Sequence, residues 1–151
     1  MGIFDTMMRY ANKFKADSGV SDEEVEEAAE QSPREKELLA ELAELSRQVP
    51  AGTGAEPVRY ALRFTGEVQG VGFRWTNQSL AEEHGLTGWV ENIYDDGSVK
   101  MQIQGPPAAI AAHLGRIHAY YSRYKNRIWI ESYERIDVDP DEEEFRVTGA
   151  W

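Results

Sequence analysis

The sequence predicts an α+β fold, in which a helical extension precedes an antiparallel sheet covered on one face by two helices. Strand-like alternation and helix-like spacing of apolar residues take turns from residue 58 onward, whereas residues 1–49 show helical spacing alone. A stretch rich in proline and glycine, residues 50–57, separates the two parts. Such a stretch neither sustains a helix nor packs a core, so we interpret it as a linker between an acidic extension, 1–49, and a domain, 58–151.

The extension is expected to form short helices. A first helical face contains Ile3, Met7, Tyr10 and Phe14. Ser18-Gly19 interrupts it, Ser21 to Glu24 has capping-box spacing, and Ser32-Pro33 places a serine cap and a first-turn proline before the next helix. The apolar stripe of that helix contains Leu38, Leu42, Leu45 and Val49. Short helices are marginal alone in water, so the stripe covers the domain, a second copy or a partner protein, three alternatives that stay open.

The first half of the domain shows a strand, a helix and two further strands. The first strand alternates Val58, Tyr60, Leu62 and Phe64 with more polar residues. Helical spacing links Phe73, Asn77, Leu80 and Ala81, and His84-Gly85 marks the helix end. A second strand is expected over 86–93, and Asp95-Asp96-Gly97 is a hairpin turn leading to the third strand around Met101.

The second half of the domain repeats the alternation. After Gly105-Pro106-Pro107, a helix presents Ile110, Leu114, Ile117 and Tyr121 on one side. A fourth strand is expected over 128–138, the acidic run 137–144 is interpreted as a solvated turn, and Phe145 and Val147 indicate a short fifth strand. The order strand–helix–strand–strand–helix–strand is that of the ferredoxin-like plait.

Composition excludes several classes of function. The chain has no cysteine, which rules out a disulfide scaffold, a thiolate zinc site and a cysteine nucleophile. The net charge of −11 argues against nucleic-acid binding, although Arg116, Arg123, Lys125 and Arg127 lie among tyrosines. No metal is expected, because His113 and His118 are not at the helical spacing that shares one face. Without a long apolar run or a secretory signal, the sequence predicts no membrane contact and a cytoplasmic protein.

Residues 66–74, Gly-Glu-Val-Gln-Gly-Val-Gly-Phe-Arg, join the first predicted strand to the first predicted helix. Gly70 and Gly72 allow a tight turn whose N–H groups converge beside the positive end of the helix. Arg74 follows in the first helical turn, where its guanidinium can hold two oxygens of a phosphate. On this pattern alone, a phosphate cradle and a purely geometric turn stay equally open. A dinucleotide motif is excluded because Trp75 replaces its last glycine, and the P-loop Gly-Lys-Ser/Thr is absent.

A second candidate is Asn92, near the end of the second predicted strand. Its amide can position a water without ionising, although asparagine is also common in turns at strand ends. The run Gly85-Leu86-Thr87-Gly88-Trp89-Val90-Glu91-Asn92 leads to it, and Asp96-Gly97 with Gly105 follows.

Together with 66–74, these blocks resemble the acylphosphatase family over residues 57–151. The resemblance implies a ferredoxin-like fold and hydrolysis of the carboxyl–phosphate bond of small acyl phosphates, without a metal or cofactor. It assigns phosphate binding to Arg74 and water orientation to Asn92. The loop residues that it implicates in phosphate binding are Gln69, Gly70, Val71, Gly72 and Phe73. Asn77 and Gln78 make the first helix more polar than is usual in the family, and residues 1–56 have no counterpart in its pattern.

A competing hypothesis is a non-catalytic anion-binding or regulatory module whose helical extension docks on a partner protein. The presence of both Arg74 and Asn92 favours the enzyme. Self-association or partner binding through the N-terminal helices stays open.

Overall fold

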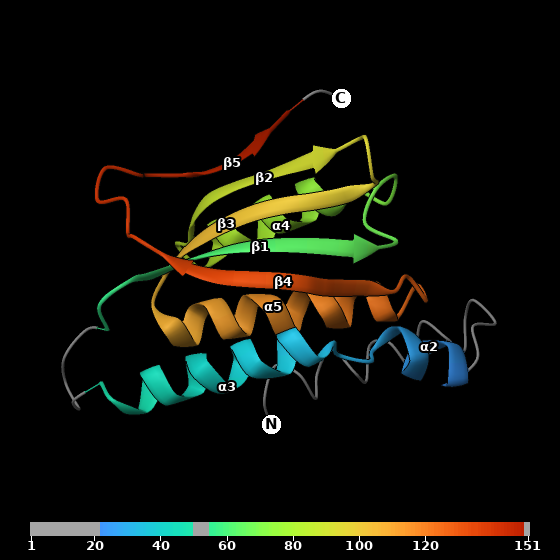
Figure 1. Cartoon of the computed structure of the whole chain (residues 1–151), viewed down its shortest axis with the longest axis horizontal. Coiled ribbons are helices and arrows are strands. Elements are labelled where there is room, and N and C mark those ends of the chain that lie inside the picture. Colours follow the sequence, from blue (N-terminus) through green and yellow to red (C-terminus); the bar gives the residue numbers. More distant parts are fainter. Residues whose placement is uncertain (1–21, 50–54, 150–151) are drawn as a thin grey trace.

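The computed structural model describes residues 22–49 and 55–149. Figure 1 shows its elements in chain order: α2 (Asp22–Ala28), α3 (Pro33–Arg47), β1 (Val58–Gly66), α4 (Phe73–Glu83), β2 (Thr87–Ile93), β3 (Ser98–Gly105), α5 (Pro107–Ser122), β4 (Ile128–Ile136) and β5 (Phe145–Thr148). The predicted face formed by Ile3, Met7, Tyr10 and Phe14 lies outside the described residues, as do Ser18-Gly19, Ser21 and residues 50–54 of the predicted linker. None of the described helices is long and apolar enough to cross a membrane.

The five strands form one sheet in the order β4-β1-β3-β2-β5. The four-strand part is antiparallel as predicted, but β5 pairs with β2 in parallel, so the sheet is mixed. The cause is the segment after β4, which crosses from one edge of the sheet to the other and starts β5 at the end where β2 also starts (Figure 1). Alternation of side chains reports a strand and not its direction, so the sequence did not show this.

Helices α4 and α5 cover one face of the sheet and close the hydrophobic core (Figure 1). The core is rich in aromatic rings: Phe73, at the start of α4, packs against Phe64 of β1 and Tyr121 of α5, with ring centroids 5.0 and 5.5 Å apart. The predicted end of the first domain helix is confirmed, because His84 is the C-cap of α4 and Gly85 has a φ of 66°. The core therefore fixes the first turn of α4 from two sides.

Helix α3 packs against α5 and the edge strand β4 of the same chain. Ser32 caps it as predicted: its hydroxyl accepts from the Glu35 N–H at 3.0 Å and donates to the Ile130 carbonyl of β4 at 2.7 Å. Leu38 and Leu42 are completely buried in the core shared with the sheet. Of the three alternatives for the α3 stripe, the structure therefore supports the domain of the same chain. The division of the chain at residues 50–57 stays a prediction.

A buried ion pair joins α3 to α5. Glu35 and His118 expose 2% and 5% of their surfaces, and His118 Nδ1 lies 2.9 Å from a Glu35 carboxylate oxygen. The other ring nitrogen, Nε2, lies 3.0 Å from the carbonyl of Ala28, the last residue of α2. Burial lowers the pKa of His118, but the hydrogen bond and charge of Glu35 outweigh it, so the pKa is raised overall. Both ring nitrogens face acceptors, which is the arrangement that a protonated imidazole satisfies.

Candidate active site

The loop between β1 and α4 turns on two glycines. Gly70 and Gly72 have φ values of 77° and 72°, a left-handed backbone that other residues rarely adopt. Gly72 is also the N-cap of α4, and no side chain caps the helix there. No capping side chain therefore competes with an anion at this end of the helix, where the positive end of the helix dipole favours negative charge.

Side chains from other elements hold this loop in place. Gln69 donates from Nε2 to the carbonyls of Ile93 at 3.1 Å and Ser98 at 2.9 Å, so the loop is tied to the β2–β3 turn. On the opposite side, the Tyr121 hydroxyl of α5 donates to the Val71 carbonyl at 3.0 Å. The sequence indicated neither bond, because each links residues far apart along the chain.

Arg74 lies in the first turn of α4 and is only 8% exposed. Its Nη1 donates to the Thr148 carbonyl of β5 at 3.1 Å. Strand β5, whose parallel direction the sequence did not predict, therefore helps to hold the guanidinium beside the loop. The sequence carries no signal for this contact, because the acceptor is the backbone carbonyl of Thr148 and not its side chain.

The predicted residues meet at one cavity of about 290 Å³. It is lined by Val68, Gln69, Gly70, Gly72, Phe73, Arg74, Trp75, Asn92 and Tyr94. Within the described part of the chain, the Oδ1 atom of Asn92 is buried and has no hydrogen-bond partner. A buried acceptor without a partner is costly, and a water in the cavity would satisfy it. Val71 is the one predicted loop residue that does not line the cavity, because its side chain packs against the core.

Two aromatic side chains border the same cavity. Trp75 follows Arg74 in α4 and is 45% exposed, and Tyr94 follows β2 and is 52% exposed. Large apolar side chains with such exposure are few in the described structure, and the others are Tyr124 and Val138. A gathering of exposed aromatic surface at a polar cavity is typical of a binding site for a partly apolar ligand.

The back of α4 is held by a buried polar pair. Asn77 donates to the Phe73 carbonyl at 2.8 Å, and its Oδ1 lies 2.9 Å from His113 Nε2 of α5. Burial, together with the charge of Arg116, lowers the pKa of His113 to about 3. The neutral ring must therefore donate from Nε2 to Asn77. This explains the unusual polarity of α4 at Asn77, which pairs inside the core.

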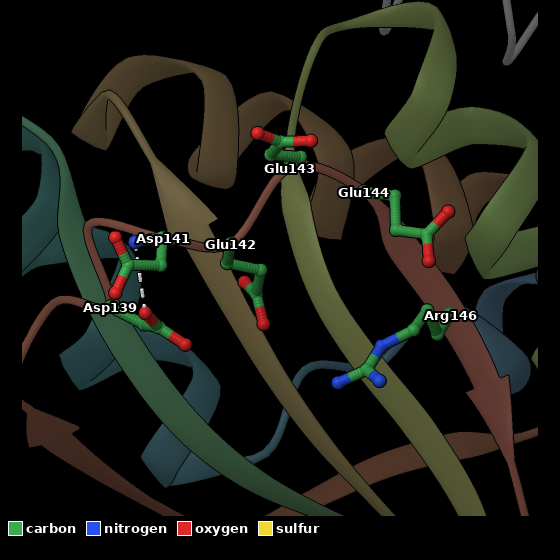
Figure 2. A pocket seen from close by; sticks show the side chains of 6 residues that line it. All are labelled: Asp139, Asp141, Glu142, Glu143, Glu144 and Arg146. Carbon is green, nitrogen blue, oxygen red and sulfur yellow. Dashed lines mark hydrogen bonds between the residues drawn. The ribbon is translucent and has the colours of Figure 1, made fainter.

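A larger cavity, of about 550 Å³, lies at the β4–β5 connection and is acidic. Figure 2 shows its lining, Asp139, Asp141, Glu142, Glu143, Glu144 and Arg146, with the carboxylates pointing in different directions. The expectation of a solvated turn is wrong at Glu142, whose side chain is 6% exposed and pairs with the buried Arg59 at 2.7 Å. Among the described residues, no cluster of three or more histidines and carboxylates could hold a metal ion. The many carboxylates make this cavity unfavourable for a phosphate.

The basic residues among tyrosines are engaged with neighbouring side chains. Arg116 is 8% exposed and binds Glu83 at 2.9 Å. The Arg123 guanidinium lies 4.4 Å from the centre of the Tyr120 ring, and that of Arg127 lies 4.4 Å from the Trp129 ring. These contacts give the cluster a structural explanation.

Comparisons with known proteins show to which family this chain belongs. The family model for acylphosphatase matches residues 60–147. An acylphosphatase from Geobacillus thermodenitrificans is 46% identical over 83 residues, which cover 54% of this chain and 84% of that protein. One from Lacticaseibacillus paracasei is 38% identical over 84 residues, covering 56% and 88%. The crystal structure of T. kodakarensis HypF is 25% identical with a TM-score of 0.51, covering 62% of this chain and 12% of that one. The matched residues include the loop, Arg74 and Asn92 and leave α2 and α3 outside.

Proposed function

Because this chain belongs to the acylphosphatase family and hydrolyses acyl phosphates, we propose that the 290 Å³ cavity is its active site. The loop N–H groups and Arg74 bind the phosphoryl group, and Asn92 orients the attacking water. The observation that carries this proposal is the meeting of three separate segments, the 69–73 loop, the first turn of α4 and the end of β2, at one cavity.

The chemistry of an acyl phosphate suits such a site. Water attacks phosphorus, the bond from phosphorus to the acyl oxygen breaks, and the products are a carboxylate and inorganic phosphate. A carboxylate is a good leaving group, since its conjugate acid has a pKa near 4. Catalysis then depends on positioning and on stabilising the charge of the phosphoryl oxygens. A fixed guanidinium and backbone N–H groups supply both, and no strong general base is needed.

Asn92 is suited to place the water. Its Oδ1 accepts one hydrogen of the water, which leaves an oxygen lone pair free to attack phosphorus. The partner-less, buried state of Oδ1 supports this role. The side-chain amide does not ionise, so this part of the site is expected to work over a broad pH range.

The acyl group lies toward the mouth of the cavity in this arrangement. Once the phosphoryl group occupies the loop, Trp75 and Tyr94 are the exposed apolar side chains along the lining, since Val68 and Phe73 are buried. They favour acyl groups with an apolar or aromatic body over a bare acetyl group. A cytoplasmic location and association through the N-terminal helices stay predictions, and the burial of Leu38 and Leu42 removes part of the α3 stripe from the surface available for association.

The proposal is tested by three variants at two residues, through kcat and kcat/KM for acetyl phosphate and the inhibition constant of inorganic phosphate. Arg74→Ala is expected to lower kcat/KM by about 10³-fold or more and to weaken phosphate inhibition. The reason is that the Arg74 guanidinium binds the phosphoryl oxygens in both the ground state and the transition state. Arg74→Lys should restore little, since a point charge lacks the two-pronged geometry. Asn92→Ala is expected to lower kcat by about 10²-fold and leave phosphate inhibition unchanged.

Matched controls are Arg63→Ala and Asn126→Ala, which remove an exposed arginine bound to Asp96 and an exposed asparagine bound to Glu67. Both should keep wild-type kinetics, and circular dichroism confirms that every variant is folded. Near-normal kcat/KM in Arg74→Ala would refute the assignment of the cavity. Weakened phosphate inhibition with intact kcat in Asn92→Ala would make Asn92 a binding residue instead.

A further inference from the structure

We propose that Tyr121 is a positioning residue of the active site, whose hydroxyl fixes the Val71–Gly72 peptide so that the Gly72 N–H faces the phosphate. This inference rests on the proposed role of the 69–73 loop as the phosphate cradle. It assigns a function to a residue of α5 that the apolar stripe of that helix marks only as core.

The contacts of Tyr121 place its hydroxyl at the loop. The side chain is 1% exposed, and its ring packs on Phe73 with a centroid separation of 5.5 Å. The hydroxyl donates to the Val71 carbonyl at 3.0 Å and lies 3.0 Å from Thr76 Oγ1. Thr76 Oγ1 in turn donates to the Gly72 carbonyl at 3.0 Å. The Val71 carbonyl is therefore held from the α5 side, and the Gly72 carbonyl is held by the hydroxyl and N–H of Thr76 in α4.

The geometry of the peptide bond turns this contact into an orientation of the N–H. No peptide in the described chain is cis, and in a planar trans peptide the C=O and the following N–H point in opposite directions. The Val71 carbonyl points at Tyr121, inside the core, so the Gly72 N–H points away from the core. Gly72 lines the cavity and Val71 does not, which agrees with that direction.

The peptide needs such an anchor. Gly72 has a φ of 72° and no Cβ, so its backbone can rotate with little steric penalty. A flipped Val71–Gly72 peptide would present a carbonyl oxygen to the anion in place of an N–H. Burial raises the pKa of Tyr121 to about 12, so the hydroxyl keeps its proton and remains a donor at any working pH.

The test is Tyr121→Phe in the full chain, which removes the hydroxyl and keeps the ring. A cradle N–H contributes to ground and transition states alike, so KM for acetyl phosphate and the inhibition constant of inorganic phosphate should both rise about 5- to 10-fold. The kcat should stay within about twofold. In ¹⁵N NMR spectra, inorganic phosphate should shift the Gly72 amide strongly in the wild type and weakly in Tyr121→Phe.

The matched control is Tyr60→Phe, which removes another buried tyrosine hydroxyl, one that binds Glu41 of α3. It should alter stability without changing KM or phosphate inhibition. If Tyr121→Phe does not fold, Thr76→Val is the second test, because it removes a competing acceptor of the Tyr121 proton while the Thr76 N–H still holds the Gly72 carbonyl. Both constants should then stay unchanged or fall, and a rise in both would contradict the inference.

Arg74→Ala, measured in parallel, separates the two proposals. Weakened phosphate inhibition in Arg74→Ala with wild-type constants in folded Tyr121→Phe would overturn the role of Tyr121 alone. Unchanged inhibition in both variants would overturn the cradle assignment and this inference with it. Loss of stability in Tyr121→Phe without a change in either constant would leave the residue a purely structural one, which contradicts the inference.

Discussion

Helix α5 carries two buried histidines whose surroundings have opposite effects. His113 lies on the side of the proposed active site, where it pairs with the uncharged Asn77 and its pKa is lowered to about 3. His118 lies on the side of the extension, where Glu35 and the Ala28 carbonyl raise its pKa. Two histidines of one helix therefore differ in charge preference: His113, behind the glycine loop, is neutral, whereas His118, beneath the extension, favours its charged form.

This comparison shows that α5 serves two purposes. Its residues Tyr121 and His113 hold the loop and α4, which present the cavity. Its residue His118, with the apolar surface around it, holds α2 and α3, and none of the described residues in 22–49 lines the 290 Å³ cavity. We therefore expect changes on the extension side to affect stability and changes on the loop side to affect kinetics.

The largest effect is expected for a chain that begins at Pro57, which tests whether the extension affects stability and not kinetics. It removes the completely buried Leu38 and Leu42 together with Glu35. Burial of two leucine side chains alone contributes about 5 kcal/mol to the free energy of unfolding. The free energy of unfolding in urea is expected to fall by at least that amount, which approaches the whole stability of many domains. Under conditions where the shortened chain is folded, kcat/KM should stay within a few-fold of the full chain.

A shortened chain that is folded but inactive would contradict the separation, because the extension would then complete the active site. Unchanged stability would show instead that the α3 contacts contribute little. Sedimentation of both chains also tests association through the N-terminal helices.

A smaller and pH-dependent effect is expected from Glu35→Gln, which keeps the shape of the side chain and removes its charge. Breaking a buried ion pair typically costs about 3 kcal/mol. Because the His118 pKa is raised in the folded state, its contribution is complete below the unfolded value of about 6.5 and is lost as pH rises through the raised pKa. The destabilisation by Glu35→Gln should therefore be largest near pH 5.5 and shrink toward pH 9.

Urea unfolding across that range measures the effect, and kcat/KM at pH 7 should not change. His113 contributes the opposite pH dependence of stability in the wild type and in Glu35→Gln alike. Its pKa is lowered on folding, so the unfolded chain binds a proton that the folded chain does not, and stability falls as pH drops below about 6.5. A destabilisation that is constant with pH would contradict the role of the His118 charge.

The smallest effect is expected at the mouth of the cavity. Trp75→Ala should lower kcat/KM for benzoyl phosphate about fivefold, because a partly covered ring contributes about 1 kcal/mol, and should leave acetyl phosphate within twofold. Tyr124→Ala, which removes another partly exposed ring away from the cavity, is the control and should change neither substrate. Equal losses for both substrates would show that Trp75 shapes the loop and does not contact the acyl group.

Local patterns in the sequence predicted most of the fold. Alternation located the strands, and the cap at Ser32 and the end at Gly85 depend on interactions within a few residues, which a sequence displays directly. The glycine loop, Arg74 and Asn92 were likewise identified as candidates, and the structure brings them to one cavity. Their chemical roles stay predictions until the variants are measured.

The rest depended on contacts between distant residues. The parallel direction of β5 follows from the path of the segment after β4, and the burial of Glu142 follows from an arginine on β1. The target of the α3 stripe was undecided because apolar spacing defines a face without naming what covers it. The contact of the Tyr121 hydroxyl was unpredictable for a similar reason, since the position of Tyr121 in a helical stripe accounts for its ring and not for its hydroxyl.

The hydrogen bond between Arg74 and the Thr148 carbonyl also determines when, during synthesis of the chain, the guanidinium can be held in place. The two residues are 74 positions apart, so at about 5 to 20 residues per second a ribosome needs roughly 4 to 15 s to add the second after the first. Asn92 is added early in that interval, so for most of it the loop, Arg74 and Asn92 all exist while the strand that holds the guanidinium does not. A nascent chain therefore contains every residue proposed to act on the phosphate before the guanidinium of Arg74 can be fixed by β5. Activity should appear only after β5 joins the sheet.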